Sequence, residues 1–302
     1  MRLYFHPDAR LIVHGTLLAE GTATRPVQFR GDRLGNMFSQ QPYDRIPGQW
    51  GGIVLTSESY GNRLNHCDIH SGTFGIRCDS SDVETEKLRL ENSVVHNMSQ
   101  DVLTLRASNV FVGNSQLTNA GGNCITLRGG NSTFVHCTIG NFYAFTGERG
   151  VALDFSNADG NARLPIHRAD FLNCLITGYS SDELLGTRSE RYPNDAFNYR
   201  FRNCLLNTPA FEDEGVEQCL WDNDDNAVAR EGNFWPAFDL DQLIFTFALD
   251  SASVAIDAAD PDITRTYYPT DRDGRDRFAD GHPDIGCYEF DHNAESEEQT
   301  RR

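Results

Sequence analysis

The stretch Leu64-Asn65-His66-Cys67-Asp68-Ile69 is the first of six copies of one pattern: an apolar residue, any residue, Asn or His, Cys or Ser, any residue, and a second apolar residue. The Cys or Ser positions are residues 67, 93, 115, 137, 174 and 204, so successive copies lie 26, 22, 22, 37 and 30 residues apart. A period in the twenties, with strand-like units and occasional long insertions, is typical of a stacked β-solenoid. The other copies begin at Leu90, Val112, Phe134, Phe171 and Phe201.

Each repeat contains a second strand-like segment in which apolar residues occupy alternate positions. The alternation predicts that these residues face the interior. The predicted inward pairs are Ile53/Leu55, Ile76/Cys78, Leu103/Leu105, Ile125/Leu127 and Val151/Leu153. An antiparallel sandwich would instead need hairpin dipeptides between adjacent strands, and the correspondence of whole motifs favours parallel coils.

The Asn or His position of the first motif is expected to form a corner of each coil. Asn suits a corner because it tolerates left-handed backbone and can hydrogen bond to its stacked neighbours. His66 and His136 fill the same position and are interpreted as turn residues rather than bases.

The chain has eight cysteines, an even number that would permit disulfides. However, Cys67, Cys137 and Cys174 occupy a position that Ser93 and Ser115 fill in other repeats, as does Cys204. A position that accepts either residue predicts a ladder of small, inward-facing side chains, so we expect buried free thiols. No Cys/His spacing suggests a zinc site, and no metal is predicted here.

Composition excludes two classes of partner. The formal net charge of −18 and the pI near 4.8 argue against nucleic acid and against anionic lipid surfaces, because both bind basic faces. No run of 18 apolar residues is present, so the chain is not expected to span a membrane.

Three segments resemble right-handed parallel β-helix proteins of the pectate-lyase-like superfamily, in particular surface proteins of Bacteroidetes type. Residues 11–29 are similar to the first coil of that family, Gln49-Trp50-Gly51-Gly52-Ile53 to the start of its repeats, and Pro283-Asp284-Ile285-Gly286-Cys287-Tyr288-Glu289-Phe290 to its closing signature. The resemblance implies an all-β, right-handed parallel β-helix at the extracellular or outer-membrane surface of a bacterium. Family members normally carry an N-terminal cap and an export signal before the first coil; we expect both to be missing here, which suggests a truncated sequence.

The predicted organisation has three parts. Residues 1–249 form the β-helix, with a long loop at 31–49 and an irregular last part at 208–249. Residues 250–290 form a C-terminal cap, since an open last coil is a bare strand edge. Residues 291–302 form a charged, disordered tail.

Two columns of outward side chains on the second strand are the candidate ligand contacts. One is predicted to hold Val54, Arg77, Thr104, Thr126 and Ala152, and the other Thr56, Asp79, Arg106, Arg128 and Asp154. In one interpretation Arg106 and Arg128 bind the carboxylate or sulfate of an acidic glycan; in the other, the column is a self-satisfied ion-pair ladder. Tyr43 and Trp50 lie in or next to the 31–49 loop, which combines aromatic and charged residues as sugar-binding surfaces do. In the alternative interpretation, the loop simply packs against the flank of the β-helix.

Neither column offers two carboxylates on neighbouring coils, and the catalytic motif set of polygalacturonase-like hydrolases is missing. The sequence therefore favours an exported protein that binds or scaffolds, with a polysaccharide or a surface-assembly protein as partner. The enzyme alternative is a polysaccharide lyase or glycoside hydrolase acting on an acidic glycan, with Arg106 or Arg128 as base and Asp79 or Asp154 as its partner. No cofactor is predicted; the run Asp271–Arg277 resembles a calcium loop faintly, and a salt-bridged cap is the preferred interpretation.

Overall fold

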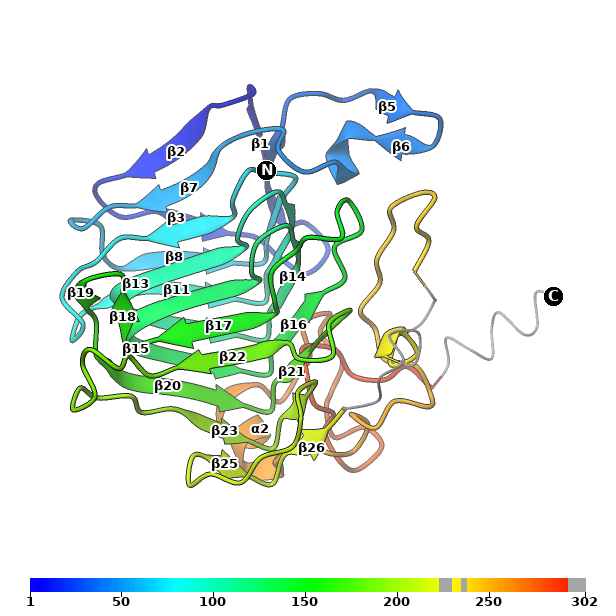
Figure 1. Ribbon diagram of the computed structural model, residues 1–302. Helices are drawn as coiled ribbons and strands as arrows, with labels where there is room; N and C mark the ends of the chain where they lie inside the picture. The colour runs from blue at the N-terminus through cyan, green and yellow to red at the C-terminus, as the bar shows by residue number, and fades with distance from the viewer. Residues whose placement is uncertain (223–229, 235–237, 293–302) are drawn as a thin grey trace.

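The structure, a computed structural model, describes residues 1–222, 230–234 and 238–292. Its strands stack in parallel coils, so that each coil hydrogen bonds to the next along the solenoid axis (Figure 1). One wall is a nine-stranded parallel sheet. In spatial order it contains β1 (Arg2–Phe5), β4 (Val27–Gly31), β9 (Cys67–His70), β12 (Val94–Met98), β14 (Gln116–Ala120), β16 (Thr138–Asn141), β21 (Leu175–Gly178), β24 (Leu205–Leu206) and β26 (Leu220–Trp221).

The second sheet has thirteen strands and makes two walls, because two of its strands are eleven residues long and run through the bend between them. These are β13 (Leu103–Gly113) and β15 (Ile125–Val135). Their first halves lie on one wall with β2 (Arg10–Val13), β7 (Gly52–Leu55), β10 (Ile76–Cys78), β17 (Leu153–Ser156) and β22 (Leu184–Thr187). Their second halves belong to the other wall with β3 (Leu18–Glu20), β8 (Asn62–Asn65), β11 (Glu86–Glu91), β20 (Ile166–Leu172), β23 (Arg200–Arg202) and β25 (Val216–Glu217).

The core is a set of apolar stacks that follow the register of the strands. Ile53 pairs with Ile76, Ile76 with Leu103, and Leu103 with Ile125. All four are buried, as the alternation predicts. The next step differs from the prediction: Ile125 pairs with Leu153, so Leu153 and Phe155 face inward instead of Val151 and Leu153.

The corner positions adopt the left-handed backbone that the sequence predicts. The φ angle is 47° at His66, 51° at Asn92, 50° at Asn114 and 49° at His136. Asn92 and Asn114 also form a ladder, in which Nδ2 of Asn114 donates to Oδ1 of Asn92 at 2.8 Å. Both histidines are therefore turn residues.

The Cys/Ser ladder is likewise confirmed. All eight cysteines are free, and seven of them are buried. The ladder residues bond along the stack: the Cys67 amide donates to Oγ of Ser93 at 2.9 Å, and the Ser93 amide to Oγ of Ser115 at 3.1 Å.

The predicted loop at 31–49 carries structure of its own. It contains an antiparallel pair, β5 (Asn36–Phe38) and β6 (Gln41–Pro42), followed by the 3₁₀ turn η1 (Tyr43–Arg45). A segment near residue 240 rises toward it in Figure 1, and Nη1 of Arg45 donates to the carbonyl of Gln242 at 2.8 Å. The loop is thus joined to a segment about two hundred residues later in the chain.

Residues 250–290 lie along the side of the solenoid, at the corner positions and over the nine-stranded sheet. The helix α2 (Pro261–Tyr267) reaches His136, whose Nε2 lies 2.9 Å from Oγ1 of Thr264. Tyr288 donates to Oε1 of Gln116 on β14 at 2.7 Å. Most of the predicted tail, residues 293–302, lies outside the described residues.

Candidate functional site

The wall formed by β7, β10, β13, β15, β17 and β22 carries the predicted columns of outward side chains. Arg106 pairs with Arg128, as predicted. Asp154, however, pairs with Thr126 and not with Arg128, which corrects the predicted column by two residues. Asp154 still faces outward because the side-chain period of a strand is two, but Ala152, which was predicted to face outward, is buried in the core.

Arg128 and Asp154 nevertheless meet, on the diagonal between neighbouring strands. Nη2 of Arg128 lies 2.6 Å from Oδ2 of Asp154, and Nη1 lies 3.1 Å from Oδ1. This is a bidentate pair, the geometry in which a guanidinium and a carboxylate hold each other most rigidly. Both side chains remain about one-fifth exposed.

Arg106 is also paired. Its Nη1 binds Oδ2 of Asp159, which projects from a small hairpin of β18 (Ala158–Asp159) and β19 (Ala162–Arg163). Arg106 and Arg128 therefore each hold a carboxylate of the same chain, which is the self-satisfied arrangement that the sequence left open.

A groove of 580 Å³ lies beside these pairs and is walled by Arg128, Asp154, Asp159 and Asp182 together with residues of β22. The walls of a second cavity, of 310 Å³, share Asp182, Leu184 and Gly186 with it and include four aromatic side chains. The aromatic side chains are Phe155, Phe197, Tyr199 and Phe211. A polar groove thus adjoins an aromatic cavity near the last coils.

The remaining candidates lie apart from this groove. Arg77 lies on β10, two strands away from β15, and Asp79 directly follows β10. The guanidinium of Arg77 donates to Oε1 of Gln100 and lies 3.8 Å from the centre of the Phe74 ring. Asp79 is exposed, and neither residue lines the groove.

The two aromatic candidates of the loop region differ from each other. Tyr43 is half-buried beneath the guanidinium of Arg33, 5.2 Å from its ring. Trp50 is fully buried, stacks on Phe5 at 4.5 Å and donates from Nε1 to the carbonyl of His70 at 2.8 Å. Burial removes Trp50 from the candidate ligand contacts, because it presents no surface to solvent.

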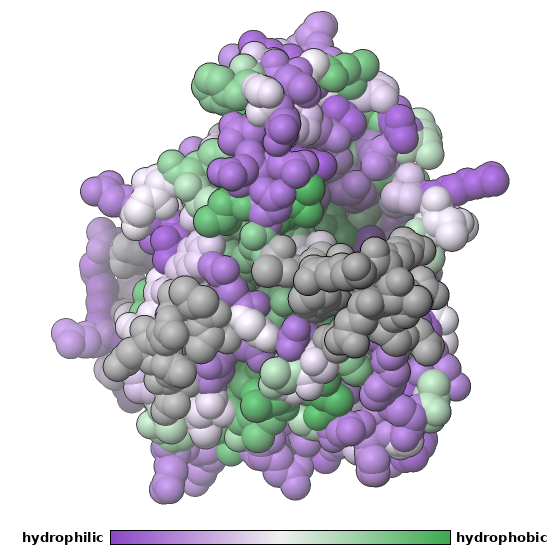
Figure 2. Space-filling model, turned by 90° about the vertical axis from the view of Figure 1, so that its right-hand side faces the viewer, coloured by the Kyte–Doolittle hydropathy of each residue, from purple (hydrophilic) through white to green (hydrophobic). Residues whose placement is uncertain are grey.

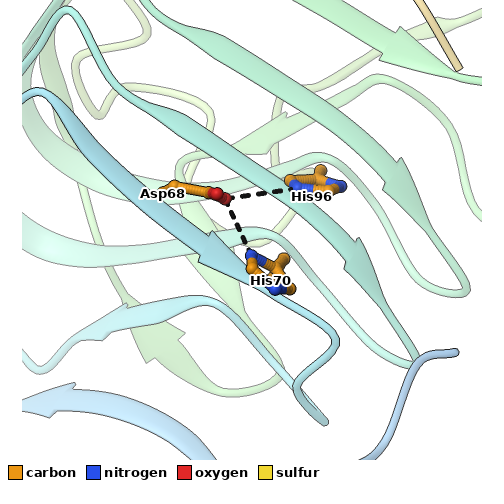
Figure 3. Close-up of side chains that lie close together, drawn as sticks. All are labelled: Asp68, His70 and His96. Carbon is orange, nitrogen blue, oxygen red and sulfur yellow. Dashed lines mark hydrogen bonds and ion pairs between the residues drawn. The ribbon is translucent and has the colours of Figure 1, made fainter. Parts of the chain in front are cut away.

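A second polar cluster, which the sequence analysis did not identify, lies on the outer face of the nine-stranded sheet. Asp68 and His70 are two residues apart on β9, and His96 on β12 pairs with His70. Figure 3 shows the Asp68 carboxylate between the two rings: Oδ1 is 2.8 Å from Nδ1 of His70 and 3.4 Å from Nε2 of His96. The repeat contained a signal for this pair, since each histidine follows the Cys/Ser position of its motif by three residues.

The other ring nitrogen of His70 contacts a residue from the loop. Its Nε2 lies 2.7 Å from Oδ1 of Asp44 on η1, and Arg30 binds the same carboxylate at 2.7 and 2.8 Å. Burial alone would disfavour the imidazolium, but the charges and hydrogen bonds of Asp68 and Asp44 outweigh it and raise the pKa of His70 to about 9. Burial also acts to raise the pKa of Asp68, yet the two histidines hold it well below its ordinary value.

The predicted calcium-like run is a network within the protein. Asp271 accepts backbone hydrogen bonds from Asp273, Arg275 and Glu289 at 2.8–3.0 Å. Arg277 pairs with Glu289 at 2.9 Å. This matches the salt-bridged interpretation preferred from the sequence.

Comparison with known proteins identifies the architecture. A family model described as "Right handed beta helix region" matches residues 36–184. The chain folds as a right-handed parallel β-helix. Among solved structures, the pectin methylesterase from Aspergillus niger in deglycosylated form is similar over 78% of this chain and 84% of its own, at 13% identity and a TM-score of 0.33. No curated protein matches the chain.

Both polar sites lie on outer walls of the β-helix, on different sheets. The groove is on the wall that ends at β22, and the Asp68–His70–His96 cluster is on the nine-stranded sheet, near the loop that carries Asp44. Figure 2, which faces the right-hand side of Figure 1, shows a largely hydrophilic surface with apolar residues below its upper lobe. Within the described residues, none of the helices is long and apolar enough to cross a membrane.

Proposed function

We propose that this β-helix binds a neutral carbohydrate, without cleaving it, in the groove beside Arg128 and Asp154. The observation that carries the proposal is the junction of two cavities, one polar and one aromatic, that share Asp182. Sugars present hydroxyl groups and apolar ring faces side by side, and a site for them needs both kinds of surface.

The polar part offers the hydrogen bonds that hydroxyl groups require. A guanidinium has donors only and a carboxylate has acceptors only, so a rigid Arg–Asp pair presents both to one ligand. Asp182, whose Oδ1 already accepts from Oγ1 of Thr208 at 2.7 Å, is also fixed in place. The groove is therefore organised before a ligand arrives, which lowers the entropic cost of binding.

Charge favours a neutral glycan over the acidic glycan considered from the sequence. The groove walls carry one arginine, Arg128, and three aspartates, a formal charge of 1 − 3 = −2. Even with Arg106, which holds Asp159, the sum is −1. A uronic acid or sulfate group entering this groove would meet unfavourable charge and would have to displace an internal carboxylate from its arginine.

The same pairs weigh against catalysis. A general acid or base must be free to exchange a proton with the substrate, whereas both oxygens of Asp154 are held by Arg128. A binding role also suits a protein exported to a bacterial surface, which is the location that the resemblance implies. A scaffolding role there would use the same rigid β-helix.

The test combines binding and product analysis. The untagged protein is applied to a panel of neutral and acidic polysaccharides, and the products are profiled after prolonged incubation. We expect retention on a neutral polysaccharide and no new oligosaccharides. Arg128→Ala should weaken retention by roughly tenfold or more, the value of a charged hydrogen-bonding group.

Arg200→Ala is the matched control, because Arg200 forms a similar ion pair with Asp170 at 3.1 Å on another wall. Its binding should equal that of the wild type. New oligosaccharides would establish an enzyme instead, binding of acidic polysaccharides alone would contradict the charge argument, and no binding across the panel would overturn the proposal.

A further inference from the structure

We propose that Asp68, His70 and His96 bind a divalent transition metal ion of the zinc class. The ligand atoms are the carboxylate Oδ1 of Asp68, Nδ1 of His70 and Nε2 of His96, which all lie within 4.8 Å of one another. This site is independent of the carbohydrate groove, because it is on the other sheet and shares no residue with it.

The solenoid brings the three side chains together by register alone. Asp68 and His70 are i and i+2 on β9, so both point outward, and His96 is the partner of His70 on the next strand. Neighbouring strands are about 4.8 Å apart, and the two imidazole centroids are 5.2 Å apart. Three potential ligands therefore project side by side from the backbone of two hydrogen-bonded strands.

The distances are close to those of a tetrahedral zinc site. With bonds of about 2.1 Å, tetrahedral ligand atoms are separated by about 3.4 Å. Nε2 of His96 is already 3.4 Å from Oδ1 of Asp68. The separation of Asp68 and His70 is shorter, 2.8 Å, because a proton now bridges Oδ1 and Nδ1. Metal binding would replace that proton, which leaves to solvent.

Asp44 provides the outer-sphere contact that metal-binding histidines characteristically have. A ligating imidazole usually donates its other N–H to a carboxylate, which fixes its orientation. Nε2 of His70 lies 2.7 Å from Oδ1 of Asp44, and Arg30 fixes Asp44 in turn. The second oxygen of Asp68 similarly accepts from Nε2 of Gln28 at 3.2 Å.

The site also has space for a ligand from solvent. His70 is 5% exposed, but the side chain of His96 is 26% exposed. His96, alone of the three ligands, lines a cavity of 160 Å³, whose walls combine polar residues such as Gln116 and Thr118 with apolar residues from the segment 243–247. Three protein ligands with an open fourth position is the arrangement of zinc sites that bind water or substrate.

The donor set selects the metal. Two imidazoles and one carboxylate suit zinc, and also iron, copper and nickel, so the class is that of divalent transition metals. Calcium requires six to eight oxygen ligands, which these residues do not supply.

The test measures metal directly. The full chain, purified without a histidine tag and treated with a chelator, is titrated with Zn²⁺ by calorimetry and then with Co²⁺, whose visible absorption reports coordination by nitrogen and a low coordination number. We expect one Zn²⁺ per chain, an increase in the melting temperature and a visible Co²⁺ band.

His96→Ala should lower zinc affinity by more than the roughly 10- to 100-fold typical of losing an outer-sphere partner, and Asp44→Asn by about that amount. The matched control is His6→Ala, because His6 pairs with Asp32 in a His–Asp contact that, among the described residues, has no third potential ligand close enough to complete a site. Asp68→Asn, which keeps the shape of the side chain, covers the case in which His96→Ala misfolds. Absence of zinc binding, or equal affinity in wild type, His96→Ala and Asp68→Asn, would overturn the proposal.

Discussion

The buried guanidinium of Arg277 donates a hydrogen bond of 2.9 Å to Oδ1 of Asn114, a corner residue 163 positions earlier in the chain. Arg277 also pairs with Glu289 at 2.9 Å and donates to the carbonyl of Gly286 at 3.0 Å. The C-terminal segment is thereby fixed to the side of the β-helix through a charge that has no access to solvent.

Replacing Arg277 should therefore destabilise the whole protein. Arg277→Met leaves the carboxylate of Glu289 buried without its partner, and we expect a loss of about 3–5 kcal/mol in the free energy of unfolding. Arg277→Met combined with Glu289→Leu should recover part of that loss. Urea denaturation measures each value, with Arg275→Met, at a half-exposed ion pair, as the control that should change little. Similar losses of stability in Arg277→Met and Arg275→Met would contradict the conclusion that the buried charge of Arg277 fixes the C-terminal segment.

The corner positions give a second prediction, which separates backbone strain from side-chain bonding. Asn203 has a φ of 49°, and its Oδ1 has no hydrogen-bond partner. Asn203→Gly should be nearly neutral, while Asn203→Ala should cost about 1–2 kcal/mol, because alanine is strained in this region. Thermal denaturation distinguishes the two.

The matched case is Asn173, with a φ of 53° but a fully bonded side chain. Its Oδ1 accepts from the amide of Asp260 at 2.9 Å and its Nδ2 donates to the Asp260 carbonyl at 3.1 Å. Asn173→Gly should therefore cost about 1–3 kcal/mol, since it leaves the buried amide of Asp260 unpaired; the Asp260 carbonyl still accepts from the amide and Oγ1 of Thr264. If glycine proves equally harmless at both corners, the side-chain bonds contribute nothing.

Thiol reactivity should follow burial. Burial raises the pKa of Cys67, Cys78 and Cys287 to about 12, so these side chains are protonated at neutral pH and poor nucleophiles. The hydrogen bond with Cys204 and burial also raise the pKa of Cys219, but its side chain is only partly buried, so access decides: in the native protein a thiol reagent should react with Cys219 before any other cysteine. After unfolding without reductant all eight should react, and a shortfall by an even number would reveal disulfides.

Stability should fall with rising pH because of Glu183. Burial raises its pKa to about 8 from an ordinary value of 4.5, against backbone hydrogen bonds from Ser180 and Ala152 that lower it. The folded state thus binds a proton that the unfolded state has released, so this contribution is complete below pH 4.5 and is lost as the pH rises to 8.

Glu183→Gln cannot titrate, so the slope of unfolding free energy against pH between about 4.5 and 8 should be smaller than in the wild type. The variant should also be less stable than the wild type. The two oxygens of Glu183 accept from the backbone amides of Ala152 and Ser180 at 2.6–2.7 Å, and in glutamine one of these oxygens becomes an NH₂ group, which cannot accept. Denaturation at a series of pH values makes the comparison, with the exposed Glu190→Gln as control. An unchanged slope in Glu183→Gln would show that the carboxyl titrates elsewhere.

The sequence by itself determined the repeating parts of this protein. Six copies of one motif predicted the parallel coils, the left-handed corners at residues such as His66, and the free thiols of the Cys/Ser ladder. Each of these is local to a repeat, because backbone preference and the alternation of apolar side chains act over a few residues.

Only the tertiary structure decided the relations between repeats of unequal length. The segment between Leu127 and Leu153 carries an insertion, and a slip of two residues keeps the same side chains inward, so alternation could not fix the partner of Asp154. The meeting of His70 with His96 required register across a 26-residue repeat, and Asp44 reached them from a loop that has no counterpart in other repeats. Such contacts depend on where a coil closes in space, which is set by packing and hydrogen bonding of the whole stack rather than by any single motif.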